Sequence, residues 1–296
     1  MQSPVDFICI GAQKAGTTAF YDLLNSHDEI SMSSKKEIHF FDIDENFMKG
    51  LDWYGSFFEE NNKLKGECTP DYLLYAYVAE RLYKSLGPKI KIIIILRSPA
   101  ERAYSQFCFH QMKGVENRRD FFKAIDAEEI DLKNEKYTSW YDPAYYLSRG
   151  MYSNQIGRYL EFFGREQIHI QLYEELFHES TKETCLNEIA EFLGVSPFIL
   201  QEAKSSNTTK VPVGGLKGEI LFRLKQSKGL IATLKKIIPS SVYTATRQKL
   251  LSNMEERPER LSKKQIAEIN NRIYREDIEQ LNQLTNKNCL IWLDNG

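Results

Sequence analysis

The sequence has little of what marks a disulfide-rich, zinc-binding or membrane-spanning protein. Its 296 residues include five cysteines, an odd number scattered along the chain, with no CxxC pair and no Cys/His cluster. A disulfide framework and a zinc site are therefore not expected, and a reducing compartment fits best. The longest strongly apolar run, residues 90–96, is far too short to cross a bilayer, so no membrane span is expected.

An excess of charge of one sign is also missing. The 39 Lys and Arg residues nearly balance the 41 Asp and Glu residues, which leaves a net charge of −2. Because the chain as a whole has no basic field, nucleic acid is not an expected partner, and any affinity for anions must be local. No leader-like segment precedes the first apolar run. We expect a cytoplasmic protein, or a soluble catalytic fragment of a Golgi-type enzyme if an anchor has been removed.

The chain alternates between apolar runs typical of strands and segments with helical spacing. Strands are predicted at residues 5–10, 29–32, 64–69, 90–96 and 167–172. Helices are predicted at residues 17–24, 51–58, 71–86, 100–112, 118–136, 150–163, 181–193 and 261–284. This alternation predicts a three-layer α/β fold in which helices flank a central parallel sheet. The isoleucine-rich run at 90–96 is typical of a central strand that is covered on both faces.

A glycine-framed loop follows the first predicted strand. Residues 11–18 read Gly-Ala-Gln-Lys-Ala-Gly-Thr-Thr, and the threonines open a helix. Such a strand–loop–helix junction gathers backbone N–H groups around an anion and adds the field of the helix dipole. A Walker A loop has its lysine directly after the second glycine, whereas here Thr17 follows Gly16 and Lys14 lies inside the turn. The loop is therefore predicted to hold a phosphate-like group without being an ordinary NTPase loop.

A second candidate lies at the end of the isoleucine strand. Ligands of open parallel sheets bind outside the carboxyl ends of the strands, and Arg97 stands at such an end. Ser105 follows two turns along the next predicted helix, so a guanidinium and a hydroxyl are available for a second phosphate. No strand ends in the aspartate that helps a P-loop enzyme hold Mg²⁺. Both this absence and the displaced lysine count against a nucleotide kinase, and no metal is expected.

A third candidate is Glu37, within the sequence Lys-Glu-Ile-His-Phe-Phe at residues 36–41. A carboxylate beside a lysine, a histidine and aromatic bulk is suited to act as a general base for a hydroxyl or an amine. The alternative is a solvated, charged turn, and the residue types alone leave both interpretations open.

Together the three segments resemble the PAPS-dependent sulfotransferases, most closely their carbohydrate (heparan-sulfate-like) and bacterial branch. Residues 11–18 are similar to the 5′-phosphosulfate loop of that family, residues 93–105 to its 3′-phosphate segment, and residues 36–41 to the stretch with its catalytic glutamate. Weaker similarities follow at residues 66–72 and 149–152 and at the C-terminal Trp292. The resemblance implies one P-loop-like α/β sulfotransferase domain over residues 1–296, with a probable acceptor or loop insertion at about 205–260.

The resemblance also implies roles for individual residues. Lys14 would neutralise the bridging oxygen as the sulfuryl group leaves, Glu37 would take the proton of the acceptor, and His39 would be an acceptor ligand or an auxiliary base. The 3′-phosphate, which distinguishes PAPS from ATP, would bind Arg97 and Ser105. The remaining nucleotide contacts implied are Gln13, the backbone N–H groups of Ala15, Gly16, Thr17 and Thr18, and Arg257 in a late basic loop. Cys68 departs from the family pattern, because relatives often have lysine or serine there.

These observations predict a sulfotransferase that moves a sulfuryl group from PAPS, leaving PAP, to a hydroxyl or amine by in-line transfer. A carbohydrate acceptor is favoured on the resemblance alone. The alternatives are a sulfotransferase for a lipid or a small secondary metabolite and, from another class, a non-catalytic nucleotide-binding module. The acceptor and the oligomeric state are not encoded in any readable motif.

Overall fold

A five-stranded parallel sheet forms the centre of the computed structural model, which describes residues 3–133, 145–199, 211–212, 255–256 and 258–294. The strand order is β2-β3-β1-β4-β5, and every neighbouring pair is parallel. The strands are β1 (Phe7–Gly11), β2 (Ile30–Met32), β3 (Leu64–Cys68), β4 (Lys91–Leu96) and β5 (Ile168–Leu172). The predicted parallel sheet is confirmed, and its strands lie within one or two residues of the expected positions.

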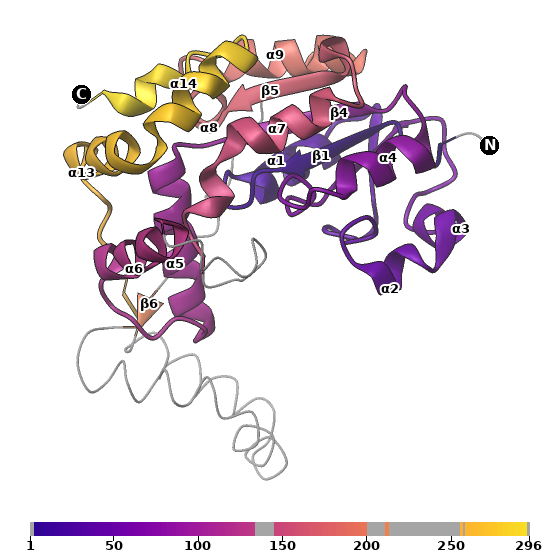
Figure 1. Ribbon diagram of the computed structural model, residues 1–296. Helices are drawn as coiled ribbons and strands as arrows, with labels where there is room; N and C mark the ends of the chain where they lie inside the picture. Colours follow the sequence, from indigo (N-terminus) through magenta and orange to yellow (C-terminus); the bar gives the residue numbers. More distant parts are fainter. Residues whose placement is uncertain (1–2, 134–144, 200–210, 213–254, 257, 295–296) are drawn as a thin grey trace, which may run out of the picture.

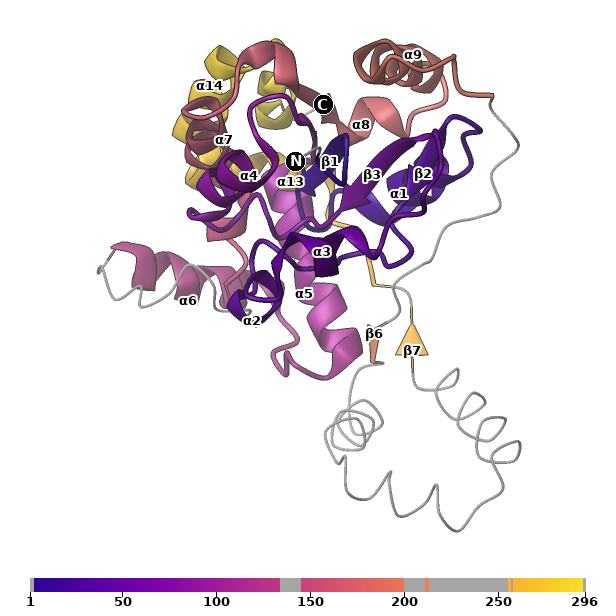
Figure 2. The same cartoon turned by 90° about the vertical axis from the view of Figure 1, so that its right-hand side faces the viewer.

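Helices cover both faces of this sheet, as the three-layer prediction requires. Figure 2 shows α4, α7 and α14 on one side of the strands and α9 on the other. The connection from β1 to β2 runs in one direction along the sheet and that from β3 to β4 in the other, so right-handed crossovers place their helices α1 and α4 on opposite faces. The larger helices are α1 (Thr17–Asn25), α4 (Val78–Leu86), α5 (Pro99–Lys113), α6 (Phe121–Lys133), α7 (Tyr152–Leu160), α9 (Lys182–Leu193), α13 (Lys263–Ile269) and α14 (Arg275–Leu284). The shorter ones are α2 (Asp44–Phe47), α3 (Gly50–Gly55), α8 (Tyr173–Leu176) and the 3₁₀ turns η1 (Ser148–Gly150), η2 (Arg165–Gln167) and η4 (Cys289–Leu293).

The two central strands explain why the sheet is parallel and covered. Every residue of β1 is buried, and so is every residue of β4 after Lys91. A strand without a polar face needs helices on both sides, and the isoleucines of β4 supply the β-branched side chains that pack well there. The core therefore fixes the carboxyl ends of β1 and β4, from which the glycine loop and Arg97 emerge.

Two predicted helices are wrong in part. The helix predicted at 71–86 begins only at Val78, because the Leu73 amide donates to the Ile10 carbonyl of β1 at 2.9 Å and turns occupy the preceding residues. The long helix predicted at 261–284 is divided: α13 and α14 are separated by a π-helical turn, η3 (Asn270–Tyr274). In the first case a backbone bond to β1 competes with the helix, and in the second the π-helical turn contains Asn270, whose side chain bonds to Ser98 and Ala100.

Most of the insertion expected at 205–260 lies outside the described residues. Within it, the short strand β6 (Val211–Pro212) pairs antiparallel with β7 (Glu255–Glu256), below α5 in Figure 1. Among the described residues, no helix combines the length and the apolar character needed to cross a membrane.

Candidate active site

The glycine loop joins β1 to α1 through two residues with left-handed backbone. Lys14 has φ 70° and Gly16 has φ 81°. Gly16 also has no room for a side chain, because an added Cβ would lie 2.7 Å from the Phe177 ring and 2.9 Å from the Tyr173 ring. Glycine at this position therefore satisfies both the backbone angle and the close approach of α8.

The start of α1 presents backbone amides that are suited to an anion. The Ala15 amide donates to the Ala12 carbonyl at 3.1 Å, so it already has an acceptor within the turn. Gly16 caps α1 without a side-chain hydrogen bond, and the first turn of α1 contains no acidic residue. The amides of Gly16, Thr17 and Thr18 have no intrahelical acceptor and remain the groups suited to a phosphate. Thr17 is buried, whereas Thr18 is exposed.

Lys14 is a partly desolvated cation in this loop. Its Nζ lies 4.1 Å from the centre of the Phe109 ring, which belongs to α5. Burial, reinforced by the positive charges of Arg102 and Arg97, lowers the pKa of Lys14 to about 8. Because these cations repel one another, an anion bound between them would be stabilised.

Arg97 leaves the carboxyl end of β4, as predicted. Its guanidinium lies 4.6 Å above the Tyr173 ring, and NH2 donates to Glu101 at 3.2 Å. In the described part of the protein the buried Arg97 Nε has no hydrogen-bond partner. Ser105 is half-buried further along α5. We refer to residues 11–18 together with residues 97–100 as the donor side; Arg257 lies outside the described residues.

Arg102, which sequence reasoning did not select, also contributes charge to the donor side. It is fully buried, and its guanidinium donates to Gln106 Oε1 at 2.9 Å and to the Tyr146 carbonyl. The bond to Tyr146 joins α5 to a segment outside the helix, and Arg102 acts on Lys14 through its charge. A fully buried arginine cannot be recognised from the pattern of a helix.

The predicted base lies in the connection that follows β2. Glu37 and His39 both have positive φ, 61° and 56°, so the chain folds back on itself here. Lys36 Nζ contacts one carboxylate oxygen of Glu37, and His39 Nε2 lies 3.9 Å from the other. The Glu37 side chain is 40% exposed, which leaves it accessible to an acceptor. We call residues 36–42 the base segment.

Asp42 is a residue of the base segment that the sequence reading missed. His39 Nδ1 lies 2.7 Å from Asp42 Oδ2, and the Asp42 side chain is almost fully buried. This hydrogen bond, added to the charge of Asp42, raises the pKa of His39. The imidazole is thereby oriented with Nε2 toward Glu37. The three-residue spacing between His39 and Asp42 was the available signal.

A buried carboxylate behind the base segment holds its backbone. Glu67 is fully buried and accepts hydrogen bonds from Tyr54, Thr69 and Tyr72, at 2.5, 2.6 and 2.9 Å. The Tyr72 hydroxyl in turn accepts from the Phe40 amide at 2.9 Å. Burial raises the pKa of Glu67, and the three hydrogen bonds, which lower it, offset only part of this effect. Glu67 therefore positions the base segment without reaching its surface.

The end of β3 connects the two parts of the site. The Cys68 carbonyl accepts from the Glu37 amide at 3.1 Å, and the Cys68 thiol lies 3.7 Å from the Thr17 carbonyl at the start of α1. Cys68 is fully buried, so it packs between the glycine loop and the base segment. The loop and the predicted base are thus neighbours in space.

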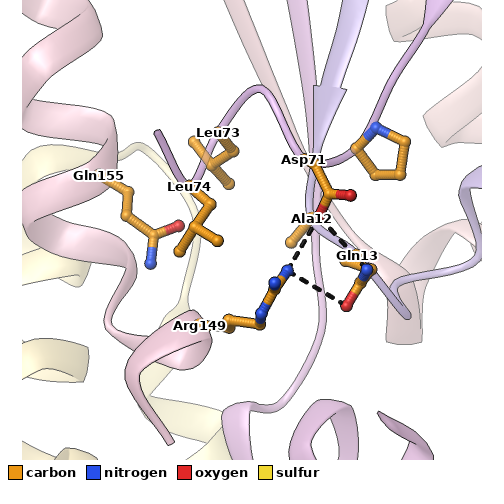
Figure 3. A pocket seen from close by; sticks show the side chains of 8 residues that line it. Ala12, Gln13, Asp71, Leu73, Leu74, Arg149 and Gln155 are labelled. Atoms are coloured by element: carbon orange, nitrogen blue, oxygen red, sulfur yellow. Dashed lines mark hydrogen bonds and ion pairs between the residues drawn. The ribbon is translucent and has the colours of Figure 1, made fainter. Parts of the chain in front are cut away.

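An ion pair lies beside the glycine loop. Arg149 NH1 lies 2.9 Å from Asp71 Oδ1, and Gln13 Nε2 donates to the same oxygen at 3.3 Å (Figure 3). A small pocket opens here, lined by Leu73, Leu74 and Gln155 as well as by these three polar residues. Gln13 is therefore engaged with the protein at the edge of the donor side.

One set of side chains among the described residues has the composition of a metal site. Ligand atoms of His39, Asp42 and Asp71 lie within 4.8 Å of one another. Two ion pairs occupy this cluster, His39 with Asp42 and Asp71 with Arg149. The contacts present therefore account for the cluster without a cation.

A comparison with models of known protein families identifies the family of the chain. Residues 4–212 match the family model described as "Sulfotransferase domain", which covers more than half of the chain. The chain belongs to the sulfotransferase family. The glycine loop, the Arg97 turn and the base segment all lie inside the matched residues of this sulfotransferase domain.

Curated relatives of the sulfotransferase domain are similar over part of their length. The chain is 34% identical over 210 residues to "Heparan sulfate glucosamine 3-O-sulfotransferase 5" of Mus musculus, which is 69% of this chain and 57% of that protein. It is 28% identical to "Membrane-associated sulfotransferase kil1" of Dictyostelium discoideum over 69% of this chain and 59% of that protein. The chain thus spans less than two thirds of the length of these relatives.

A solved structure supports the fold. A sulfotransferase from Alicyclobacillus acidocaldarius is 28% identical, with a TM-score of 0.57, and the similarity covers 75% of this chain and 92% of that chain. The shared architecture includes the parallel sheet that places the donor side.

Proposed function

We propose that this sulfotransferase domain moves a sulfuryl group from PAPS to a hydroxyl, or an amine, of a carbohydrate acceptor. The observation that carries the proposal is the convergence of Lys14 and Arg97 next to a base segment with an accessible Glu37. Burial, together with the positive charges of Arg102 and Arg97, lowers the pKa of Lys14. Two cations at strand ends suit a donor with two phosphate positions, and a nearby carboxylate suits an acceptor that must lose a proton.

The proposed transfer breaks the bond between sulfur and the bridging oxygen of the 5′-phosphosulfate. The acceptor oxygen attacks the sulfur in line, its proton passes to Glu37, and PAP leaves with the bridging oxygen next to Lys14. The first-turn amides of α1 hold the 5′-phosphate, while Arg97 and Ser105 bind the 3′-phosphate. Because these cations neutralise the charge that develops on the leaving group, no metal is assigned to the reaction.

The base segment leaves one carboxylate oxygen of Glu37 available to the acceptor. Lys36 occupies one carboxylate oxygen, which leaves the oxygen that faces His39 for the acceptor. Asp42 keeps the His39 ring in one orientation, so that His39 is suited to bind the acceptor or to relay its proton. A carbohydrate acceptor is supported by the similarity to a relative named for heparan sulfate glucosamine 3-O-sulfation.

Labelled-PAPS transfer tests the proposal. The enzyme is incubated with [³⁵S]PAPS and separate pools of sugars, phenols and lipid alcohols, with EDTA present. We expect label in the sugar pool at a rate that EDTA leaves unchanged. Label only in the phenol or lipid pool would replace the acceptor class, and a strict requirement for magnesium would contradict the metal-free transfer. Binding of PAP without transfer to any pool would favour a nucleotide-binding module.

A further inference from the structure

The turn that presents Arg97 is held by side chains from much later in the chain. The Tyr152 hydroxyl of α7 donates to the Arg97 carbonyl at 3.1 Å, and the Ser98 amide donates to Glu174 Oε1 of α8 at 2.9 Å. The Ala100 amide donates to Asn270 Oδ1 of the π-helical turn at 3.0 Å. The first polar groups after β4 are thus bound by three separate elements.

Asn270 makes the largest share of these contacts. It is fully buried, and besides accepting from Ala100 it donates to Ser98 Oγ at 3.0 Å and to the Trp292 carbonyl at 2.8 Å. A single amide therefore ties the donor side to the C-terminal turn η4. Asn270 is the first residue of η3, and π-helical turns of this kind often occur at functional sites.

The direction of the Arg97 guanidinium depends on the backbone that Asn270 fixes. Among the described residues, the side chain itself is supported by the Tyr173 ring and by Glu101, which is 31% exposed. A small rotation of the turn at residues 97–100 would therefore move the guanidinium relative to the glycine loop. Bidentate recognition of a phosphate by arginine requires that such a movement be small.

We propose that Asn270 is a positioning residue for donor selectivity: by holding the turn at residues 97–100, it aligns Arg97 with the 3′-phosphate of the nucleotide. This inference rests on the proposed use of PAPS. Among the described residues, the hydrogen bonds of Asn270 go to Ser98, Ala100 and Trp292 and none goes to the glycine loop, which would bind the 5′-phosphate. Loss of Asn270 should therefore weaken recognition of the 3′-phosphate and leave the remainder of the nucleotide bound as before.

The test compares PAP with AMP, which lacks the 3′-phosphate, by titration calorimetry at constant salt. For the wild-type protein we expect PAP to bind much more tightly than AMP. In Asn270→Ala we expect this preference to fall by about tenfold or more, through weaker PAP binding, while the affinity for AMP changes by less than about threefold. A role limited to stability would lower the fraction of active protein and would leave the ratio of the two affinities unchanged.

Asn271 provides the matched control. It lies in the same π-helical turn and donates to the carbonyls of Ala267 and Leu293 at 2.7 and 2.8 Å, away from the Arg97 turn. Asn271→Ala should retain the wild-type preference for PAP. Thermal unfolding of both variants reports on the fold.

A milder variant keeps the test decisive if Asn270→Ala does not fold. Ser98→Ala removes only the hydroxyl that accepts from Asn270, and we expect it to lower the preference by about two- to fivefold. A wild-type preference that survives in Ser98→Ala, and in Asn270→Ala where that variant folds, would overturn the positioning role alone. A wild-type protein that binds PAP and AMP equally would instead overturn the proposed donor.

Discussion

The donor side and the base segment are built in different ways. On the donor side, Lys14 and Arg97 lie just beyond the ends of β1 and β4, strands that are almost entirely buried. The base segment takes no part in the sheet: it follows the short strand β2, contains two non-glycine residues with positive φ, and leaves Glu37 40% exposed. The donor side is positioned by buried strands, whereas the base segment is a loop held by its buried Ile38, Phe40 and Phe41 side chains and by a few hydrogen bonds.

Because of this difference, we expect the donor side to control nucleotide binding and the base segment to control turnover. The core fixes the strand ends from which Lys14 and Arg97 emerge, so under the proposed function changes on the donor side should alter nucleotide binding. The base segment depends on side chains such as Tyr72 and Asp42, so changes there should alter turnover and leave nucleotide binding intact. Cys68 contacts both parts and shows how closely they lie together.

The largest expected effect is at Lys14. Replacing it in Lys14→Met removes the cation beside the leaving oxygen, and transfer should fall by about 10²–10³-fold. The variant should be as stable as the wild type or more stable at pH 7, because the lowered pKa means that the charged lysine destabilises the fold. Activity and thermal unfolding measure the two effects.

Lys113 is the matched control for Lys14. It is exposed on α5, and its Nζ lies 5.4 Å from the centre of the same Phe109 ring. Lys113→Met should retain wild-type activity. Equal losses in the two variants would show that general positive charge, and not the placement of Lys14, supports transfer.

Tyr72 tests whether the base segment depends on buried hydrogen bonds. Tyr72→Phe removes the hydroxyl between Glu67 and the Phe40 amide, and kcat should fall by about tenfold because Glu37 is less well placed. The affinity for PAP should stay unchanged.

Tyr159→Phe is the companion variant. The Tyr159 hydroxyl is also buried and donates to the Tyr72 carbonyl at 2.7 Å; in the described part of the chain it has no hydrogen bond to the base segment. Both variants should lose about 1–3 kcal/mol of unfolding free energy. If kcat falls equally in both variants, the Tyr72 hydroxyl stabilises the fold and does not position Glu37.

The pH dependence of nucleotide binding should come from Lys14. Because the pKa of Lys14 is about 8 in the ligand-free protein and a bound phosphate restores it upward, PAP binding above pH 8 should take up a proton. PAP affinity should then fall by at most about tenfold per pH unit above 8. Calorimetry in buffers of different ionisation enthalpy measures the uptake. A pH profile of the same shape in Lys14→Met would assign the proton to another group.

The smallest effect is expected at Asp42. Asp42→Asn removes the charge that raises the pKa of His39, so the imidazole should titrate at lower pH in an NMR experiment. The Asp42 bond favours protonated His39, so the stability that it adds is present at low pH and is lost as the pH rises through the pKa of His39. Transfer should change by less than about tenfold, because Glu37 remains in place. An unchanged His39 titration would contradict the pairing.

The sequence was sufficient for the parts of the site that depend on local pattern. The strands, the glycine loop and the position of Arg97 follow from apolar runs and from what stands directly after them. Contacts between distant segments were not readable: Asn270 lies 172 positions from Ser98, and nothing in a helical pattern distinguishes it from Asn271. The helix predicted over residues 71–77 was wrong for the same reason, because the Leu73 amide bonds to β1.

The most direct test of the two-part account is Glu37→Gln, with PAP binding and single-turnover transfer measured on the same preparation. The variant keeps the size of the side chain and removes the base. The account predicts that transfer falls by about 10²–10⁴-fold while the PAP dissociation constant stays within about twofold of wild type. Unchanged transfer would contradict the assignment of Glu37 as the base, and loss of PAP binding together with transfer would contradict the separation of the base segment from the donor side.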